Sequence, residues 1–398
     1  MGGQARGARP SNLGKVAPVR TATIDVPANA IEDLRARLAS TRWFDWAEGS
    51  GWAYGTDIDY LRGLCAYWES GFDWAAIQER LNSFGQVETF VDGQRIHAFH
   101  VRSPRSDATP LLLVHGWPGS VLEFIDVLAP LSDPDGHGCQ GGPAFHVVCP
   151  SIPGYGFSGP TRVPGWNLRR ISGAFDGLMD ELGYHAYAAA GGDWGANIAT
   201  DLARSDRAHH LTGLHLTMPM GVAPLDDARP DLDPFERTGL DDWARSLATG
   251  VVNHVATNSH RPHTMALAMN DSPAGLACWL VDMIRSFTVG DGDVEEALTR
   301  DQLLANASVY WFTGTIASAC RLYWEWRVQK AAQPDPPFVS TPTSVAVFPS
   351  DVRRLPRSWS EPLYNIVDWQ VMPAGGHFAS WEQPEAFVSS LRSGLSRG

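Results

Sequence analysis

Between residues 110 and 220 the sequence carries short, wholly apolar segments at 111–114, 145–149 and 187–190. Apolar segments without polar–apolar alternation are typical of strands buried on both faces of a sheet. Residues 169–183 place their apolar side chains on one helical face and separate two of these segments, and a further strand is expected over 211–218. This alternation predicts βαβ units and therefore an α/β fold with a mostly parallel central sheet.

Residues 221–335 interrupt this pattern with several helical stretches that are rich in aromatic residues. The segment opens with the Pro- and Asp-rich PLDDARPDLDPF and closes with QPDPPF, and such composition is typical of connecting segments. The α/β pattern then resumes with strands predicted near 344–348 and 367–372 and a last helix from Pro384. We therefore expect an inserted helical lid over 221–335. The core would then consist of residues 106–220 and 336–398.

Residues 21–105 precede the core and predict helices followed by a hairpin. Apolar side chains at i, i+3 and i+7 in residues 31–38 indicate one helix face, and a second helix follows. Asp92-Gly93 stands between two β-rich runs, which is a strong hairpin signal. The start of the chain is rich in Gly and Pro and lacks the apolar core of a signal peptide, so we expect a disordered tail over 1–20.

The composition excludes several classes of partner. The formal net charge is -13, so a nucleic acid or an anionic membrane surface would repel the chain. The five cysteines are dispersed, odd in number and without zinc-binding spacing, which favours reduced thiols, a cytoplasmic location and no bound metal. No run of about 18 apolar residues occurs, so we expect no membrane anchor.

An apolar strand ends in GGDWG at 191–195, and a helical pattern follows at once. This is the arrangement of a nucleophile elbow, in which small residues permit a strained strand-to-helix turn that presents one side chain above the sheet. The central residue is Asp193, whose carboxylate can displace at an alkyl carbon and form an alkyl-enzyme ester. The helix N-terminus favours its ionised state. A helix-capping Asp is the alternative, and the strand, the helix and both flanking glycines together argue against it.

The segment HGWPGS at 115–120 follows another buried strand, at the place expected for an oxyanion-hole loop. The backbone N–H groups of Trp117 and Trp194 are predicted to point at the carbonyl oxygen of an Asp193 ester. Removing one such donor typically costs about 3 kcal/mol. We interpret His115 as a residue that shapes the loop by bonding backbone groups, and we do not count it as a catalyst.

A carboxylate and a histidine follow the last two predicted strands. The motif GGHF places His377 on a loop at the C-terminal edge of the sheet, where it can deprotonate water for attack on the ester. The Gly-Gly before it and the chain order nucleophile, acid, histidine argue against a mere surface histidine. Asp351 follows the preceding strand and is the predicted partner that orients His377. Glu361 and Asp368 are the rivals, and Asp368 is disfavoured because it lies within a predicted strand.

Together these residues resemble the epoxide hydrolases of the microsomal type, over nearly the whole chain from about residue 20. The shared motifs are HGWPGS at 115–120, IPGYGFSG at 152–159, GGDWG at 191–195, NDSPAGL at 270–276, YWFTGTIASACRLY at 310–323 and GGHFASWEQPE at 375–385. The resemblance implies an α/β-hydrolase fold, an epoxide as the small-molecule substrate, a vicinal diol as the product and no cofactor. The family's carboxylate follows a Phe-Pro-x sequence, as Asp351 does here.

The family pattern also implies two lid tyrosines that hydrogen-bond the epoxide oxygen and protonate the leaving alkoxide. Tyr323 matches one of them, although a packed lid aromatic is the alternative interpretation. At the place of the other, VNHV at 252–255 has no tyrosine, and His254 is the nearest substitute. Either His254 replaces the second donor or Tyr323 acts alone. The aromatic residues of the lid favour a bulky, apolar or aromatic epoxide.

Two other functions stay open at this point. A haloalkane dehalogenase also uses an elbow aspartate, but it would need halide-binding donors instead of a lid tyrosine and would lack the N-terminal region. A non-catalytic binding protein could keep the scaffold, but it would have no need of a nucleophile, an acid and a histidine. The sequence does not identify the epoxide, and a homodimer stays as open as a monomer.

Overall fold

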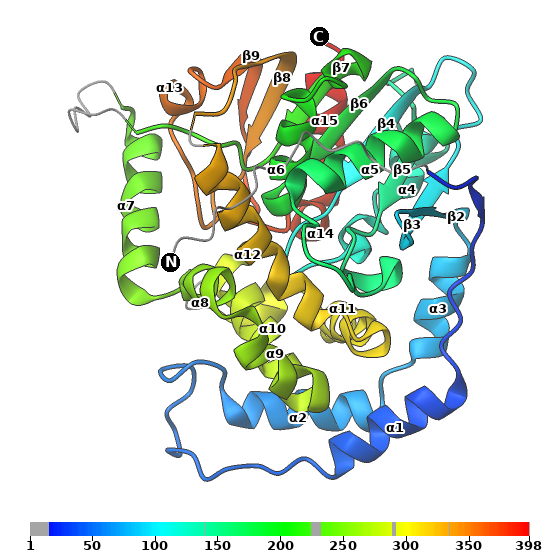
Figure 1. Cartoon of the computed structure of the whole chain (residues 1–398). Coiled ribbons are helices and arrows are strands. Elements are labelled where there is room, and N and C mark those ends of the chain that lie inside the picture. The colour runs from blue at the N-terminus through cyan, green and yellow to red at the C-terminus, as the bar shows by residue number, and fades with distance from the viewer. Residues whose placement is uncertain (1–15, 140, 224–231, 289–291, 334, 398) are drawn as a thin grey trace, which may run out of the picture.

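The computed structural model describes residues 16–139, 141–223, 232–288, 292–333 and 335–397. Within these residues one sheet has the strand order β1-β2-β3-β5-β4-β6-β7-β8-β9 (Figure 1). The strands are β1 (Arg20–Thr21), β2 (Gln86–Val91), β3 (Gln94–Val101), β4 (Thr109–Val114), β5 (Phe145–Pro150), β6 (Tyr187–Gly191), β7 (Leu211–Leu216), β8 (Val339–Val347) and β9 (Tyr364–Val371). Neighbours from β5 through β9 are parallel, and β1, β2 and β3 join antiparallel. The predicted α/β fold with a mostly parallel sheet is confirmed.

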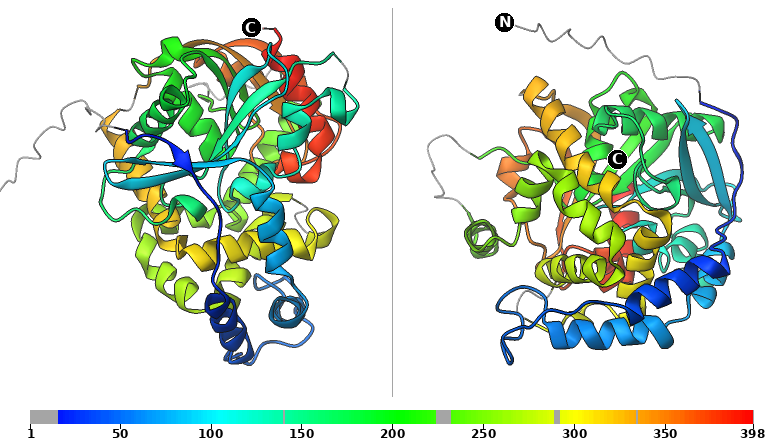
Figure 2. Two further views of the ribbon diagram at one scale, coloured as in Figure 1. Left: turned by 90° about the vertical axis from the view of Figure 1, so that its right-hand side faces the viewer. Right: turned by 60° about the horizontal axis from the view of Figure 1, so that its bottom comes forward.

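The wholly apolar segments form the centre of this sheet. Leu111 in β4 pairs with Val147 of β5 on one side and with Ala188 of β6 on the other, and all three are buried. Helices α5 (Leu168–Glu181) and α6 (Asp193–Ala203) lie on one face of the sheet, and α15 (Pro384–Leu395) lies on the other (Figure 2). The central strands are apolar throughout because helices cover both of their faces.

The hairpin predicted at Asp92-Gly93 joins β2 to β3. Asp92 and Gly93 have φ angles of 52° and 77°, which is the left-handed pair that a two-residue hairpin turn requires. Residues 1–15 of the expected tail lie outside the described residues. From residue 16 the chain pairs with this hairpin, because Val16 forms a bridge with Val91 and Arg20 begins β1.

The N-terminal helices pack beneath the inserted segment (Figure 1). They are α1 (Ala28–Ala39), α2 (Ile58–Ser70) and α3 (Trp74–Asn82), and α3 was not predicted from the sequence. The Trp68 indole of α2 donates to Ser308 Oγ at 3.0 Å, and Arg37 Nη1 of α1 donates to the carbonyl oxygen of Asp271 at 2.9 Å. The N-terminal region therefore braces the segment that we expect to form the lid.

That segment is helical between β7 and β8. Its helices are α7 (Pro234–Thr249), α8 (Asn253–His260), α9 (Pro262–Asp271), α10 (Pro273–Thr288), α11 (Arg300–Thr313) and α12 (Ile316–Ala332). Helix α12 packs against α8 and α9, and α11 follows α10 toward the N-terminal helices (Figures 1 and 2). The remaining helices of the described chain are short: α4 (Leu128–Ser132), α13 (Arg357–Ser360) and α14 (Ala379–Glu382).

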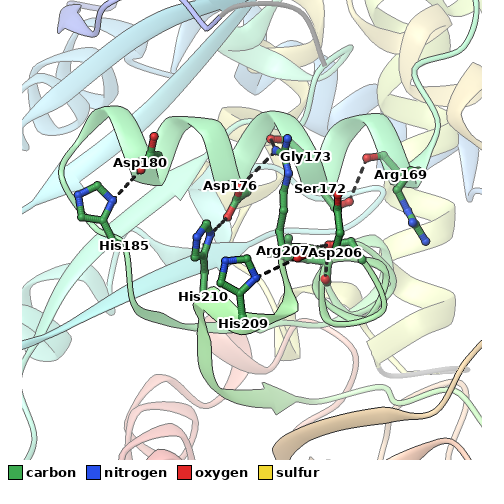
Figure 3. Close-up of polar contacts among 12 residues, drawn as sticks. Arg169, Ser172, Gly173, Asp176, Asp180, His185, Asp206, Arg207, His209 and His210 are labelled. Atoms are coloured by element: carbon green, nitrogen blue, oxygen red, sulfur yellow. Dashed lines mark hydrogen bonds and ion pairs between the residues drawn. The ribbon is translucent and has the colours of Figure 1, made fainter. Parts of the chain in front are cut away.

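The buried carboxylate of Asp176 in α5 bonds residues of the segment that follows α6. Asp176 accepts from Arg207 Nη1 at 3.2 Å and from His210 Nδ1 at 2.7 Å (Figure 3). It also accepts from the Tyr187 hydroxyl at 2.8 Å. These contacts tie α5 to β6 and to the residues between α6 and β7.

Two further features of the described residues concern membranes and metal ions. None of their helices is long and apolar enough to cross a membrane. The same residues contain no group of three or more His, Cys, Asp or Glu side chains arranged to hold a metal ion.

Candidate active site

The sequence GGDWG forms a sharp turn between β6 and α6. Asp193 has a φ of 47°, a left-handed conformation that L residues adopt only under strain. A Cβ on Gly195 would lie 1.9 Å from the carbonyl oxygen of Val114, and one on Gly191 would lie 2.6 Å from the same atom. Both positions therefore require glycine. The turn lifts the Asp193 side chain above the C-terminal edge of the sheet, as an elbow does.

The loop that follows β4 contacts the Asp193 carboxylate directly. The Trp117 N–H donates to Asp193 Oδ1 at 2.8 Å, and the Trp194 N–H also bonds this carboxylate. The loop can approach so closely because residue 116 is glycine, where a Cβ would lie 2.5 Å from the Cβ of Asp193. Burial raises the pKa of Asp193, and the nearby His377 and the two N–H groups oppose that rise. The two predicted oxyanion-hole donors thus lie together at the nucleophile position.

His115 lies in the same loop and is buried. Its Nδ1 bonds the carbonyl oxygen of Gly116 at 2.9 Å, and its Nε2 accepts from the N–H of Ile152 at 3.1 Å. Burial lowers the pKa of His115 to about 4, so the ring is neutral. Both ring nitrogens are occupied by backbone groups, which is the loop-shaping role expected from the sequence.

Two side chains of α11 donate hydrogen bonds to the loop that follows β4. The Tyr310 hydroxyl donates to the carbonyl oxygen of Gly119 at 2.7 Å, and Asn306 Nδ2 donates to that of Pro118 at 2.8 Å. Both residues are buried. Neither residue could be recognised from the sequence, because nothing local in a helix marks a contact with a loop about 190 residues away.

His377 and Asp351 form a buried pair at the same edge of the sheet. His377 Nδ1 lies 3.0 Å from Asp351 Oδ1, and each side chain is 4% exposed. The loops that carry them are joined by the N–H of Ser350, which donates to the carbonyl oxygen of Gly375 at 2.9 Å. Glu382 accepts from the Phe378 N–H at 2.9 Å and so holds the histidine loop in place.

The charges around His377 favour its protonated form. Burial lowers the pKa of His377, but the carboxylates of Asp351, Asp193 and Glu123 outweigh burial and raise the pKa to about 9. In the protein as it stands, the imidazole is therefore protonated at neutral pH. Removal of one of these negative charges would lower the pKa of His377 and favour the neutral imidazole.

The rival carboxylates lie elsewhere. Asp368 is within β9, where its carboxylate accepts from Ser344 Oγ at 3.3 Å and from Arg397 Nη1 at 3.0 Å. Glu361 accepts from Arg357 Nε at 2.8 Å. The structure thus brings Asp351 to His377 and gives both rivals other partners.

The lid residues lie over the elbow as a cluster of rings. Tyr323 of α12 is buried and packs edge-on against the indole of Trp194, with 4.6 Å between ring centroids. His254 of α8 stacks on Trp117 at 4.9 Å and lies edge-on to Tyr323 at 5.6 Å. Burial lowers the pKa of His254 to about 3. His254 is buried, so it is not a surface residue of the lid.

A pocket of about 210 Å³ lies between the elbow and the lid. Its lining includes the nucleophile candidate Asp193 and the polar side chains of Asn197 and Arg353. Its other lining residues are Trp194, Met218, Trp243, Val252, His254, Val255, Phe287, Tyr323, Trp326, Val352 and His377. An apolar and aromatic wall with few polar groups is typical of a site for a small apolar molecule.

The comparisons with known proteins cover both parts of the chain. The family model for the epoxide hydrolase N terminus matches residues 19–124, and the model for the alpha/beta hydrolase fold matches residues 109–384. A relative from Stigmatella aurantiaca, named as an epoxide hydrolase, is 40% identical over 93% of this chain and 83% of its own length. Epoxide hydrolase 1 of Oryctolagus cuniculus is 33% identical over 97% of this chain and 90% of its own length.

Solved structures agree with these matches. The juvenile hormone epoxide hydrolase of Bombyx mori superposes with a TM-score of 0.86 and 27% identity, over 96% of this chain and 94% of that one. The epoxide hydrolase of Aspergillus niger gives a TM-score of 0.84 and 28% identity, over 96% of both chains. The resemblance to epoxide hydrolases and the α/β-hydrolase fold are therefore confirmed, and the chain belongs to the epoxide hydrolase family.

Proposed function

We propose that this epoxide hydrolase converts its epoxide to a vicinal diol through an ester of Asp193. The observation that carries the proposal is the position of Asp193 at a positive φ, bonded by the Trp117 N–H, with the Tyr323 pocket and the buried His377–Asp351 pair both beside it. A carboxylate placed between a proton donor and a water-activating base suits two successive displacements.

In the first step Asp193 attacks an epoxide carbon, and the C–O bond of the ring breaks. The Tyr323 hydroxyl gives its proton to the departing alkoxide, which yields a hydroxyalkyl ester and a phenolate. Burial raises the pKa of Tyr323 well above its usual range, and the carboxylate of Asp193 adds to that rise. The phenol is therefore fully protonated when the substrate arrives, as a general acid must be.

In the second step water attacks the ester carbonyl carbon while His377 takes one of its protons. The Trp117 and Trp194 N–H groups donate to the carbonyl oxygen as it gains negative charge. The tetrahedral species expels the diol oxygen, which takes the proton from His377. The proton released as Asp193 ionises again restores the Tyr323 phenol. The imidazole takes back from solvent the proton that it loses once the ester forms, so the protein returns to its starting state without a cofactor.

The electrostatics of the pair give the two steps an order. Before reaction, the negative charge of Asp193 is one of the causes that raise the pKa of His377 to about 9. Formation of the ester removes that charge, so the pKa of His377 falls and the imidazole can lose its proton. His377 therefore becomes a base only after the nucleophile has reacted.

The pocket supports a bulky, apolar or aromatic epoxide as the substrate. Its lining is largely aromatic and aliphatic, and such walls favour apolar ligands through burial of their surface. Turnover of styrene oxide to its diol tests the activity and would exclude a non-catalytic binding protein. Halide release from haloalkanes with no diol from any epoxide would instead favour a dehalogenase.

The ester itself is tested by one turnover in heavy-oxygen water with the protein in excess. We expect the label in the Asp193 carboxylate and unlabelled diol, because water attacks the ester carbonyl and not the substrate carbon. Label in the first diol would mean direct attack by water and would overturn the mechanism.

We also propose a cytoplasmic location, supported by the five cysteines, all of which are free thiols. A homodimer is the assembly that we put forward for test, and sedimentation at micromolar concentration distinguishes it from a monomer.

A further inference from the structure

Glu123 is a buried carboxylate that the proposed mechanism does not use. It lies in a short 3-10 helix, Val121–Phe124, directly after the oxyanion-hole loop, and its relative exposure is 8%. The Gly116 N–H bonds its carboxylate, but Oε1 has no hydrogen-bond partner among the described residues. Buried polar atoms without a protein partner are rare, and such an atom calls for a bound water or a chemical role.

The carboxylate faces a second, smaller cavity at the elbow. This cavity has a volume of about 20 Å³, and its lining includes Glu123, Asp193, Thr217 and His377. A site needs about 10–15 Å³ and two to four polar partners to hold one water molecule. The cavity meets both conditions and is too small for an organic substrate.

The small cavity adjoins the substrate pocket at the elbow. Among the described residues that line them, the two cavities have Asp193 and His377 in common. A water in the small cavity would therefore reach the Asp193 carbonyl carbon and His377 without displacing the alkyl group in the large one. Burial raises the pKa of Glu123 to about 8, and the neighbouring charge of His377 opposes that rise.

We propose that the small cavity holds the water that hydrolyses the Asp193 ester and that Glu123 orients this water by accepting its second hydrogen. The inference rests on the proposed function, since it assumes that an ester forms. One hydrogen of the water points to His377 and the other to Glu123, which turns an oxygen lone pair toward the ester carbonyl. His377 takes the first hydrogen as a proton, the O–C bond forms, and the second hydrogen stays on the oxygen that becomes part of Asp193.

Glu123 also acts on the pKa of His377. In its ionised form Glu123 helps to raise the pKa of His377. A residue that only supported the loop would act on both chemical steps, because the loop carries the N–H of Trp117 that bonds Asp193 in the first step. Orientation of the water concerns the second step alone.

The experiment separates the two steps in Glu123→Gln and Glu123→Leu. With styrene oxide and the protein in excess, rapid quenching and intact-mass measurement follow the rise and decay of the ester. We expect ester formation within about threefold of the wild-type rate. We expect its decay to slow by about tenfold in Glu123→Gln and about 10²-fold in Glu123→Leu, which are modest fractions of what positioning can contribute.

The exposed Glu296 provides the matched control, and Glu296→Gln should leave both rates unchanged. Circular dichroism establishes that each variant is folded, and Glu123→Gln carries the test if the leucine variant does not fold. Decay at the wild-type rate in the folded variants, or an equal slowing of both steps, would overturn the role of Glu123. Absence of any ester in the wild-type protein and in His377→Gln would instead overturn the proposed mechanism, and with it this inference.

Discussion

The two sides of the pocket are built in different ways. On the core side, Asp193, Asp351 and His377 come from loops that follow β6, β8 and β9, and hydrogen bonds hold each of these side chains. On the lid side, Tyr323 and His254 come from two helices and are held by ring packing on Trp117 and Trp194. The core side has its geometry fixed by the sheet, whereas the lid side depends on how helices pack.

This difference separates the two halves of the reaction. The carboxyl ends of parallel strands meet at one edge of a sheet, so the groups that form and hydrolyse the ester are positioned by topology. In the proposed mechanism the lid positions the proton donor and shapes the space for the substrate. We therefore expect substitutions of His377 and Asp351 to stop the second step and substitutions on the lid side to slow the first.

The largest effect is expected for His377→Gln. The ester should still form, because Asp193 and Tyr323 are intact, but its hydrolysis should slow by on the order of 10⁶-fold, as loss of a triad histidine does elsewhere. Mass spectrometry should detect an adduct heavier by one substrate mass. His185, a histidine with a side chain 72% exposed (Figure 3), is the control, and His185→Gln should behave as wild type. An inactive His377 variant without adduct would show that His377 acts before the ester forms.

Asp351→Ala should slow the same step by less, on the order of 10⁴-fold, because Asp351 orients the base and does not replace it. The Asp351 carboxylate also raises the pKa of His377, so the Asp351→Ala variant should show the pH dependence of ester decay shifted to lower pH. Single-turnover decay across pH measures both effects. If Asp351→Ala slowed ester formation and left decay intact, the core side would not divide the work as we propose.

Tyr323→Phe is the corresponding test of the lid side. Loss of the general acid should slow ester formation by about 10²–10⁴-fold and leave ester decay near the wild-type rate. Rapid quenching with styrene oxide measures the first rate. The exposed Tyr54 offers the control variant Tyr54→Phe. Wild-type ester formation in Tyr323→Phe would mean that Tyr323 is not the proton donor and does not match the family's lid tyrosine.

The core side could be predicted from the sequence, and the reason is local. An apolar run followed by GGDWG, and strands followed by Asp351 and by GGHF, mark where each loop stands relative to the sheet edge. The pattern of apolar runs also predicted the strand positions of the core. Helix α3 was missed because it buries little, with Trp74 and Leu81 as its buried residues.

The lid side was less predictable because its contacts join distant parts of the chain. Spacing suggested His254, but its stacking on Trp117 depends on the packing of α8 and cannot be read from residues 252–255. Tyr310 and Asn306 reach the oxyanion-hole loop from α11 and carry no local signal. Glu123 was overlooked for a similar reason, since its burial and the cavity beside it are not visible in the sequence around residue 123.

The pH dependence of ester decay should show a smaller effect, and it concerns His377 on the core side. His377 has a pKa of about 9 while Asp193 is charged, and the ester lacks that charge. Since the neutral imidazole is the base, decay should slow as the pH falls through the pKa of His377, by about tenfold per pH unit below it. The midpoint should lie below 9, and single-turnover decay between pH 5 and 9.5 measures it. A decay rate independent of pH across this range would argue against His377 as the base.

The smallest effect is expected for His254, whose contribution the sequence left open. Burial lowers its pKa to about 3, so the imidazole is neutral through the physiological range and cannot deliver a proton in the way that a histidinium would. It can still donate an N–H to the epoxide oxygen, and one neutral hydrogen bond contributes about 1 kcal/mol, which corresponds to about fivefold in rate. His254→Phe keeps a ring to stack on Trp117 and should slow ester formation by about that factor, with no change in its pH dependence. His254→Ala also removes the stacking and should slow ester formation further, since Tyr323 packs against the same ring.

A loss of more than 100-fold in His254→Phe, together with a wild-type rate that falls as the pH rises through about 6.5, would make His254 the acid and Tyr323 its support. The lid would then supply a titrating donor, and the contrast with the core side would have to be redrawn.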